Sequence, residues 1–155
     1  MLRRVFFFAM LFIMAIFLMG NPVSAQQVRG VTDTEILISQ WGPQTGPAAP
    51  WGAVARGTGL FFKIINEEGG IHGRKIKYFL RDDSYQPAKT KAIGKEFVED
   101  IGVFAVVGGV GVGPGMTVRD YFMENKVPWA GPVTGVYEWI RPFQRYLFAI
   151  YPLYD

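Results

Sequence analysis

Four apolar runs of strand length divide the chain, and each is followed by residues that end a strand, chiefly Gly and Pro. The runs lie at 35–40, 75–82, 103–107 and 127–130. Between them, apolar residues recur at helical spacing in three segments, 52–68, 87–99 and 116–125. This alternation of strands and helices predicts an α/β fold of three layers, α/β/α, with a mostly parallel sheet.

The first helical segment, 52–68, carries its large apolar residues largely on one stripe. They are Val54, Leu60, Phe61, Ile64 and Ile65. The stripe predicts an amphipathic helix, and Gly69 and Gly70 supply its stop signal. The run 103–107 lacks polar residues between its apolar ones, which is typical of a parallel strand covered on both faces.

Beyond Gly135 the pattern fades, although residues 146–150 are compatible with one further strand. In open parallel sheets, ligands bind beyond the carboxyl ends of the strands. The loops at those ends, 41–51, 82–87, 108–115 and 131–138, are therefore the candidate binding loops.

The amino terminus has the three parts of a signal peptide. Arg3 and Arg4 form the basic start, residues 5–19 form an uncharged apolar core, and Val23-Ser24-Ala25 provides small residues for cleavage after Ala25. The apolar core is short for a membrane-spanning helix, although an uncleaved anchor is the alternative. The sequence therefore predicts export of a mature chain that begins at Gln26.

Composition narrows the classes of function. Of the 16 basic residues, Arg3 and Arg4 lie in the predicted signal peptide, and 13 acidic residues oppose the rest. The mature chain is therefore nearly neutral, without the clustered basic face of a nucleic-acid-binding protein. The absence of cysteine excludes disulfides, thiolate catalysis and thiolate metal sites.

Residues with catalytic or cofactor-binding potential are few. The glycines of 109–111 begin a dinucleotide fingerprint, but Pro114 stands in place of its third glycine, and the loop has no lysine for a phosphate-binding loop. His72 is the only histidine. Asp82 and Asp83 are adjacent, so a strand would point them to opposite faces. We therefore expect no enzymatic activity, no metal and no cofactor.

Five segments, in order along the chain, resemble one protein family. They are GPQTGPAAPWG at 42–52, INEEGGIHGR at 65–74, RDDSYQP at 81–87, VVGGVGVGPG at 106–115 and GPVTG at 131–135. Together they resemble the periplasmic leucine/isoleucine/valine-binding proteins, which feed ABC importers. The resemblance covers nearly the whole mature chain.

The resemblance implies a receptor of two α/β lobes that clamp a ligand between them. Residues 26–145 would form the amino-terminal lobe, and 146–155 a truncated approach to the hinge and second lobe. The implied function is solute binding for an ABC importer of branched-chain amino acids, related amides or small carboxylates. The implied partners are that amino acid or similar ligand, the membrane permease and the missing second lobe.

Within the resemblance, the ligand carboxylate falls at Gly111, Val112 and Gly113. Many family members have Ser or Thr hydroxyls there, whereas Val112 and Gly113 leave only main-chain N–H donors, aided by the positive end of the following helix. The alternative is that these glycines only permit a tight turn.

Four further residues complete the implied site. Val133 and Thr134 match the turn that offers a carbonyl and a hydroxyl, Trp51 matches the aromatic that lines the pocket, and Tyr85 matches a wall position. The alternatives are a capping or turn role for Thr134, packing against a helix start for Trp51, and core packing for Tyr85.

Two other functions stay open at this point. The same fold serves as the sensor domain of a chemoreceptor or regulator, and α/β scaffolds also carry hydrolases and oxidoreductases, although no nucleophile, base or cofactor loop is found here.

The family's ammonium-binding acid and closing aromatics come mainly from the second lobe. We therefore expect weak or undetectable binding by this chain alone.

Overall fold

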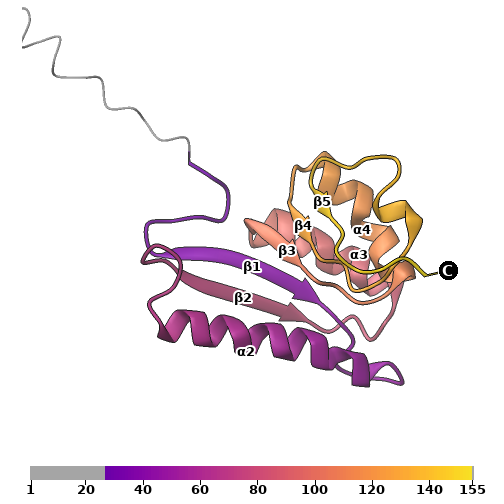
Figure 1. Ribbon diagram of the computed structural model, residues 1–155, viewed down its shortest axis with the longest axis horizontal. Helices are drawn as coiled ribbons and strands as arrows, with labels where there is room; N and C mark the ends of the chain where they lie inside the picture. Colours follow the sequence, from indigo (N-terminus) through magenta and orange to yellow (C-terminus); the bar gives the residue numbers. More distant parts are fainter. Residues whose placement is uncertain (1–26, 155) are drawn as a thin grey trace, which may run out of the picture.

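The computed structural model describes residues 27–154, and the predicted signal peptide, 1–25, lies outside them. Within this range the chain forms one sheet of parallel strands in the order β2-β1-β3-β4-β5 (Figure 1). The strands are β1 (Glu35–Trp41), β2 (Lys75–Arg81), β3 (Ala105–Val107), β4 (Trp129–Ala130) and β5 (Leu147–Phe148). The predicted parallel sheet is confirmed.

Within residues 27–154, three α-helices cover the two faces of the sheet. They are α2 (Ala53–Glu67), α3 (Pro87–Lys95) and α4 (Val112–Glu124). Helix α2 lies on one face, and α3 and α4 lie on the other, which gives the predicted three layers (Figure 1). No helix in 27–154 combines the length and the apolar composition needed to cross a membrane.

The main core lies between the sheet and the pair α3 and α4. Trp41, Phe122 and Trp129 are completely buried at its centre, and the ring centroids of Trp41 and Trp129 are 5.2 Å apart. Ile93 and Phe97 reach it from α3 and the π-helical turn η2 (Glu96–Asp100) that follows. This aromatic packing joins the carboxyl end of β1 to β4 across the intervening strand β3.

Helix α2 buries a different face from the one marked by its large apolar residues. Of the predicted stripe, only Ile65 packs against the sheet, whereas Leu60 and Phe61 are about 60% exposed (62% and 59%). The side that faces the sheet combines the small residues Ala55 and Gly59 with Phe62, whose ring packs edge-on against Tyr78 at 5.4 Å between centroids. A Cβ at Gly59 would lie 3.1 Å from Cε1 of Tyr78, so the missing side chain lets the helix approach β2 closely.

Helix α4 begins at Val112, earlier than the predicted start at Met116. The sequence predicted a loop at 113–115 because these residues are Gly and Pro. However, Pro114 lies in the first turn, where a missing N–H costs nothing. A Cβ at Gly115 would lie 2.9 Å from Trp139, so glycine is needed there for packing. The glycine-rich loop is therefore shorter than predicted.

The predicted further strand near 146–150 is present as β5, which pairs with β4. After it the chain returns to the turn at Gly135, where the Tyr154 N–H donates to the Gly135 carbonyl at 2.7 Å. Leu147 is buried, but Phe148 and Ile150 are 55% and 82% exposed. Residues 147–148 thus belong to the sheet, and their role in approaching a second lobe stays a prediction.

Candidate functional site

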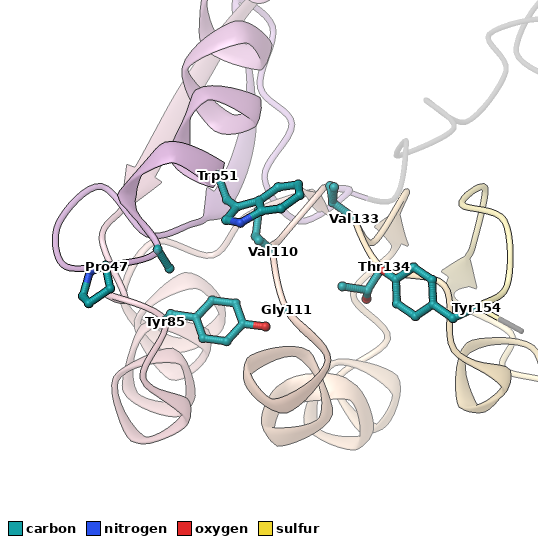
Figure 2. Close-up of a pocket in the computed structure, with 9 residues that line it drawn as sticks. Pro47, Trp51, Tyr85, Val110, Gly111, Val133, Thr134 and Tyr154 are labelled. Atoms are coloured by element: carbon teal, nitrogen blue, oxygen red, sulfur yellow. The ribbon is translucent and has the colours of Figure 1, made fainter.

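A pocket of about 440 Å³ lies at the carboxyl edge of the sheet, where the segments that follow the five strands meet. It is lined by Pro47, Ala48, Trp51, Tyr85, Val110, Gly111, Val133, Thr134 and Tyr154. Figure 2 shows Trp51 and Tyr85 on one side of it, with Thr134 and Tyr154 on the other. The binding loops therefore gather on one rim, as the sequence predicted.

The structure brings together five of the seven predicted ligand-binding residues. Trp51, Tyr85, Gly111, Val133 and Thr134 line the pocket. The other two, Val112 and Gly113, do not line it, and they belong to the first turn of α4. Ligand binding by all seven stays a prediction.

Trp51 reaches the pocket from the short turn η1 (Ala49–Gly52). The loop before it is held by Gln44, whose Nε2 donates to the Gly42 carbonyl at 3.1 Å and whose Oε1 accepts from Arg56 at 2.8 Å. The indole of Trp51 is 61% exposed. Such exposure does not fit the alternative of a tryptophan packed against the helix start, and it leaves an aromatic face available to a ligand.

Tyr85 stands in an unusual backbone conformation. Its φ is +59° and that of Ser84 is +49°, in the left-handed region that side chains with a Cβ rarely adopt. The ring lies against Gly111, where a Cβ would come within 2.6 Å of Cε2 of Tyr85. Tyr85 is 43% exposed, so it forms a wall of the pocket and not part of the core.

Gly111 caps the amino terminus of α4 with a φ of +103°. The first-turn N–H groups that follow, at Val112 and Gly113, have no acceptor within the helix. They lie at the positive end of the helix dipole, which favours an anion. This end of α4 adjoins the pocket through Gly111, although no side chain of the loop offers a hydroxyl.

Val133 and Thr134 form the opposite wall. The Val133 N–H donates to the Gly109 carbonyl at 3.0 Å, which fixes the turn after β4 against the loop after β3. Thr134 is 7% exposed, and its hydroxyl accepts from Trp139 Nε1 at 3.1 Å. The hydroxyl proton is not used in that contact, so it can donate to an acceptor in the pocket.

Four lining residues were not predicted from the sequence. They are Pro47, Ala48, Val110 and Tyr154. The first three lie in segments that carried the family resemblance, so their position in the binding loops was a usable signal. Tyr154 had no such signal, because it reaches the pocket through long-range contacts of residues 152–154 with Gly135.

The pocket is electrically neutral in its side chains, since none of its lining residues is charged. The acidic pair Asp82 and Asp83, which follows the carboxyl end of β2, is not part of the lining. A hydrogen bond from the Thr45 hydroxyl is the main cause that lowers the pKa of Asp82, whereas burial raises the pKa of Asp83. Within 27–154, no three His, Asp or Glu side chains gather closely enough to hold a metal ion.

Comparison with known proteins identifies the class. Residues 35–155 match the family model described as periplasmic binding protein. The chain therefore belongs to this family, whose members are binding proteins and not enzymes, in agreement with the sequence prediction. Within it, the chain is related to the Leu/Ile/Val-binding proteins.

Two curated relatives and one solved structure illustrate the relationship. Leu/Ile/Val-binding protein homolog 1 of Brucella abortus is 31% identical over 94 residues, which are 60% of this chain and 25% of the relative. The leucine-, isoleucine-, valine-, threonine-, and alanine-binding protein of Pseudomonas aeruginosa is 37% identical over 76 residues, 48% of this chain and 20% of the relative. The chain thus spans about a quarter of the length of these relatives.

The solved structure is that of the branched-chain amino acid transporter substrate binding protein LivJ from Streptococcus pneumoniae, in complex with isoleucine. It superposes with a TM-score of 0.71 at 24% identity, over 77% of this chain and 34% of that chain. This likeness concerns the fold. The chain corresponds to one lobe of a two-lobe periplasmic binding protein.

Proposed function

We propose that this chain is the amino-terminal, ligand-binding lobe of a solute receptor that serves an ABC importer. The ligand we propose is a branched-chain amino acid or a related amide or small carboxylate. The observation that carries the proposal is the neutral pocket at the sheet's carboxyl edge, lined by Trp51, Tyr85, Gly111, Val133 and Thr134. Relatives with amino acid-binding names support the ligand class.

The polar end of such a ligand has a matching partner at α4. The N–H groups of Val112 and Gly113 would receive the carboxylate, because they lack helical acceptors and lie at the positive helix end. The Thr134 hydroxyl would donate a further hydrogen bond. No lining side chain supplies a charge for the ammonium group, which we assign to the second lobe.

The apolar end of the ligand would lie against aromatic and aliphatic walls. Trp51 offers an exposed ring, and Val110 and Val133 border the same pocket. Covering an aliphatic side chain in this way stabilises the bound state by about 25 cal/mol for each Å² of apolar surface removed from water. Polar contacts beside a covered side chain also strengthen, because water no longer competes for them.

One lobe supplies one wall of such a site. We therefore propose that this chain alone binds weakly, and that a polypeptide supplying the second lobe closes the site and raises affinity. The remaining partner would be the membrane permease, which would bind the closed form of the receptor. The periplasm is the proposed compartment, with the signal peptide cleaved after Ala25.

Ligand-induced stabilisation tests the proposal even for weak binding. A ligand at about ten times its Kd stabilises the folded state by about 1.4 kcal/mol. We expect L-leucine, L-isoleucine or L-valine at millimolar concentration to raise the melting temperature of the mature chain. The matched control is leucinol, which lacks the carboxylate. Equal effects of leucine and leucinol, or none from any amino acid tested, would contradict the proposal.

A further inference from the structure

We propose that Asp82 and Asp83 are positioning residues that hold Tyr85 against Gly111 and thereby shape the pocket. This inference rests on the proposed function, since it concerns the same pocket. The two carboxylates follow β2 directly and do not line the pocket themselves. Their effect on a ligand would therefore pass through Ser84 and Tyr85.

The two aspartates each accept a hydrogen bond from a backbone N–H two residues further on. The Ser84 N–H donates to Asp82 Oδ1 at 2.8 Å, and the Tyr85 N–H donates to Asp83 Oδ1 at 3.1 Å. Ser84 and Tyr85 are the two consecutive residues with positive φ. Left-handed backbone at residues with a Cβ costs about 1 kcal/mol or more each and persists only when surrounding contacts fix it.

Asp82 also ties this turn to the loop that carries Trp51. Its Oδ1 accepts from the Gln44 N–H at 2.7 Å, and its Oδ2 accepts from the Thr45 hydroxyl at 2.5 Å. The Thr45 and Ser84 hydroxyls lie 2.9 Å apart. One carboxylate thus fixes the loops after β1 and β2 to each other, and these loops contribute Trp51 and Tyr85.

Asp83 attaches this turn to helix α3. It is completely buried, and its Oδ2 accepts from the Thr90 hydroxyl at 2.8 Å on α3. A buried carboxylate with two hydrogen-bond donors is fixed in direction. The Tyr85 ring that this turn presents fits only because residue 111 is glycine, since a Cβ there would come within 2.6 Å of the ring.

The test uses a readout that needs no ligand. An aromatic ring held over a glycine displaces that glycine's Hα resonance, so the Gly111 Hα shift of the full chain measures the position of Tyr85. We expect Asp82→Ala and Asp83→Ala to return this shift toward the value of a Tyr85→Ala variant. Asp83→Asn keeps an acceptor oxygen and should retain the shift, which covers the case in which Asp83→Ala does not fold. The control is Asp120→Ala, an exposed aspartate on α4.

A rescue separates positioning from general destabilisation. Glycine adopts positive φ without strain, so Ser84→Gly in the Asp82→Ala background should restore part of the Gly111 shift. In L-leucine titrations, Asp82→Ala should weaken binding about tenfold relative to Asp120→Ala, a loss comparable to that of one good hydrogen-bonded contact.

The outcomes distinguish the two proposals. An unchanged Gly111 resonance in the folded Asp82→Ala and Asp83→Ala variants overturns the positioning role, whatever leucine does. A resonance that moves as expected upholds the positioning role even if the parent chain shows no leucine binding, and that second result counts against the proposed function alone.

Discussion

The indole N–H of Trp139 donates a hydrogen bond to the hydroxyl of Thr134 at 3.1 Å, and both side chains are buried at the edge of the pocket. The indole satisfies an acceptor position of the hydroxyl and so directs its proton elsewhere. This pairing links the 3-10 turn η3 (Tyr137–Trp139) to a residue that lines the pocket.

Replacing Thr134 with Val should cost about 1–3 kcal/mol in the free energy of unfolding, because the buried Trp139 N–H loses its acceptor. In a Trp139→Phe background the same replacement should cost less, since no donor is left unpaired. Urea unfolding of the four proteins in this cycle measures the difference. Additive costs would show that the hydrogen bond contributes nothing.

A Gly111→Ala variant should be strongly destabilised. Its φ of +103° disfavours any side chain, and the new Cβ would meet the Tyr85 ring at 2.6 Å. Gly113→Ala is the matched control, because that site has ordinary φ and its nearest neighbour is Pro87 Cγ at 3.8 Å. The control should be neutral or gain up to about 1 kcal/mol from helix propensity. Thermal unfolding that ranks the two variants in the opposite order would contradict the assigned geometry.

The contribution of Asp82 to stability should depend on pH. The pKa of Asp82 lies below its usual value of 3.8 in the folded chain, chiefly because of the Thr45 hydroxyl. Its stabilisation is therefore fully present above the unfolded pKa and is lost as the pH falls through the folded pKa. We expect the stability difference between the parent and Asp82→Asn to be largest near neutral pH and to shrink below about pH 4.

Thr45→Val supplies the comparison for this pH dependence, since it removes the main cause of the lowered pKa and leaves the carboxyl in place. Its cost should shrink over the same acidic range. Denaturant unfolding between neutral and acidic pH measures both variants. A difference that stays constant, or grows on acidification, would show that the Asp82 carboxylate is not stabilised in the folded state.

Trp51→Ala should separate binding from folding. The indole is 61% exposed, so its removal should change the free energy of unfolding by less than about 0.5 kcal/mol. Its place in the pocket predicts a clear loss of L-leucine binding. Leu60→Ala, which removes a similarly exposed side chain outside the pocket, should leave binding unchanged. Equal L-leucine binding by the two variants would show that Trp51 does not contribute to the binding site.

The element order and the parallel sheet could be predicted because apolar runs and helical spacing are local properties of the sequence. The buried face of α2 could not. Its contact with β2 is made by Phe62, which packs on the Tyr78 ring, and by the small residues Ala55 and Gly59, whose size matters only once that ring lies beside them. The large residues Leu60 and Phe61, which dominate the pattern, are exposed.

In the site, too, the features that depend on local sequence could be predicted and those that depend on tertiary contacts could not. Trp51, Tyr85 and Gly111 could be placed together because they follow strands whose carboxyl ends meet. The predicted start of α4 was wrong because Gly113 and Pro114 are typical of loops, and only packing against Trp139 explains why residue 115 of the helix is a glycine. Tyr154 reaches the pocket because residues 152–154 pack on Gly135, a contact that no local pattern encodes.

The most direct test of the central claim is an NMR titration of the isotope-labelled mature chain with L-leucine, which detects even millimolar binding. The account predicts shifts of the Val112 and Gly113 amides and of the Trp51 indole N–H. It predicts none at Phe104 or Lys126, which lie before the amino ends of β3 and β4, the far edge of the sheet from the pocket. Leucinol should not move the two amides. Leucine-induced shifts confined to the far edge, or identical responses to leucine and leucinol at Val112 and Gly113, would contradict it.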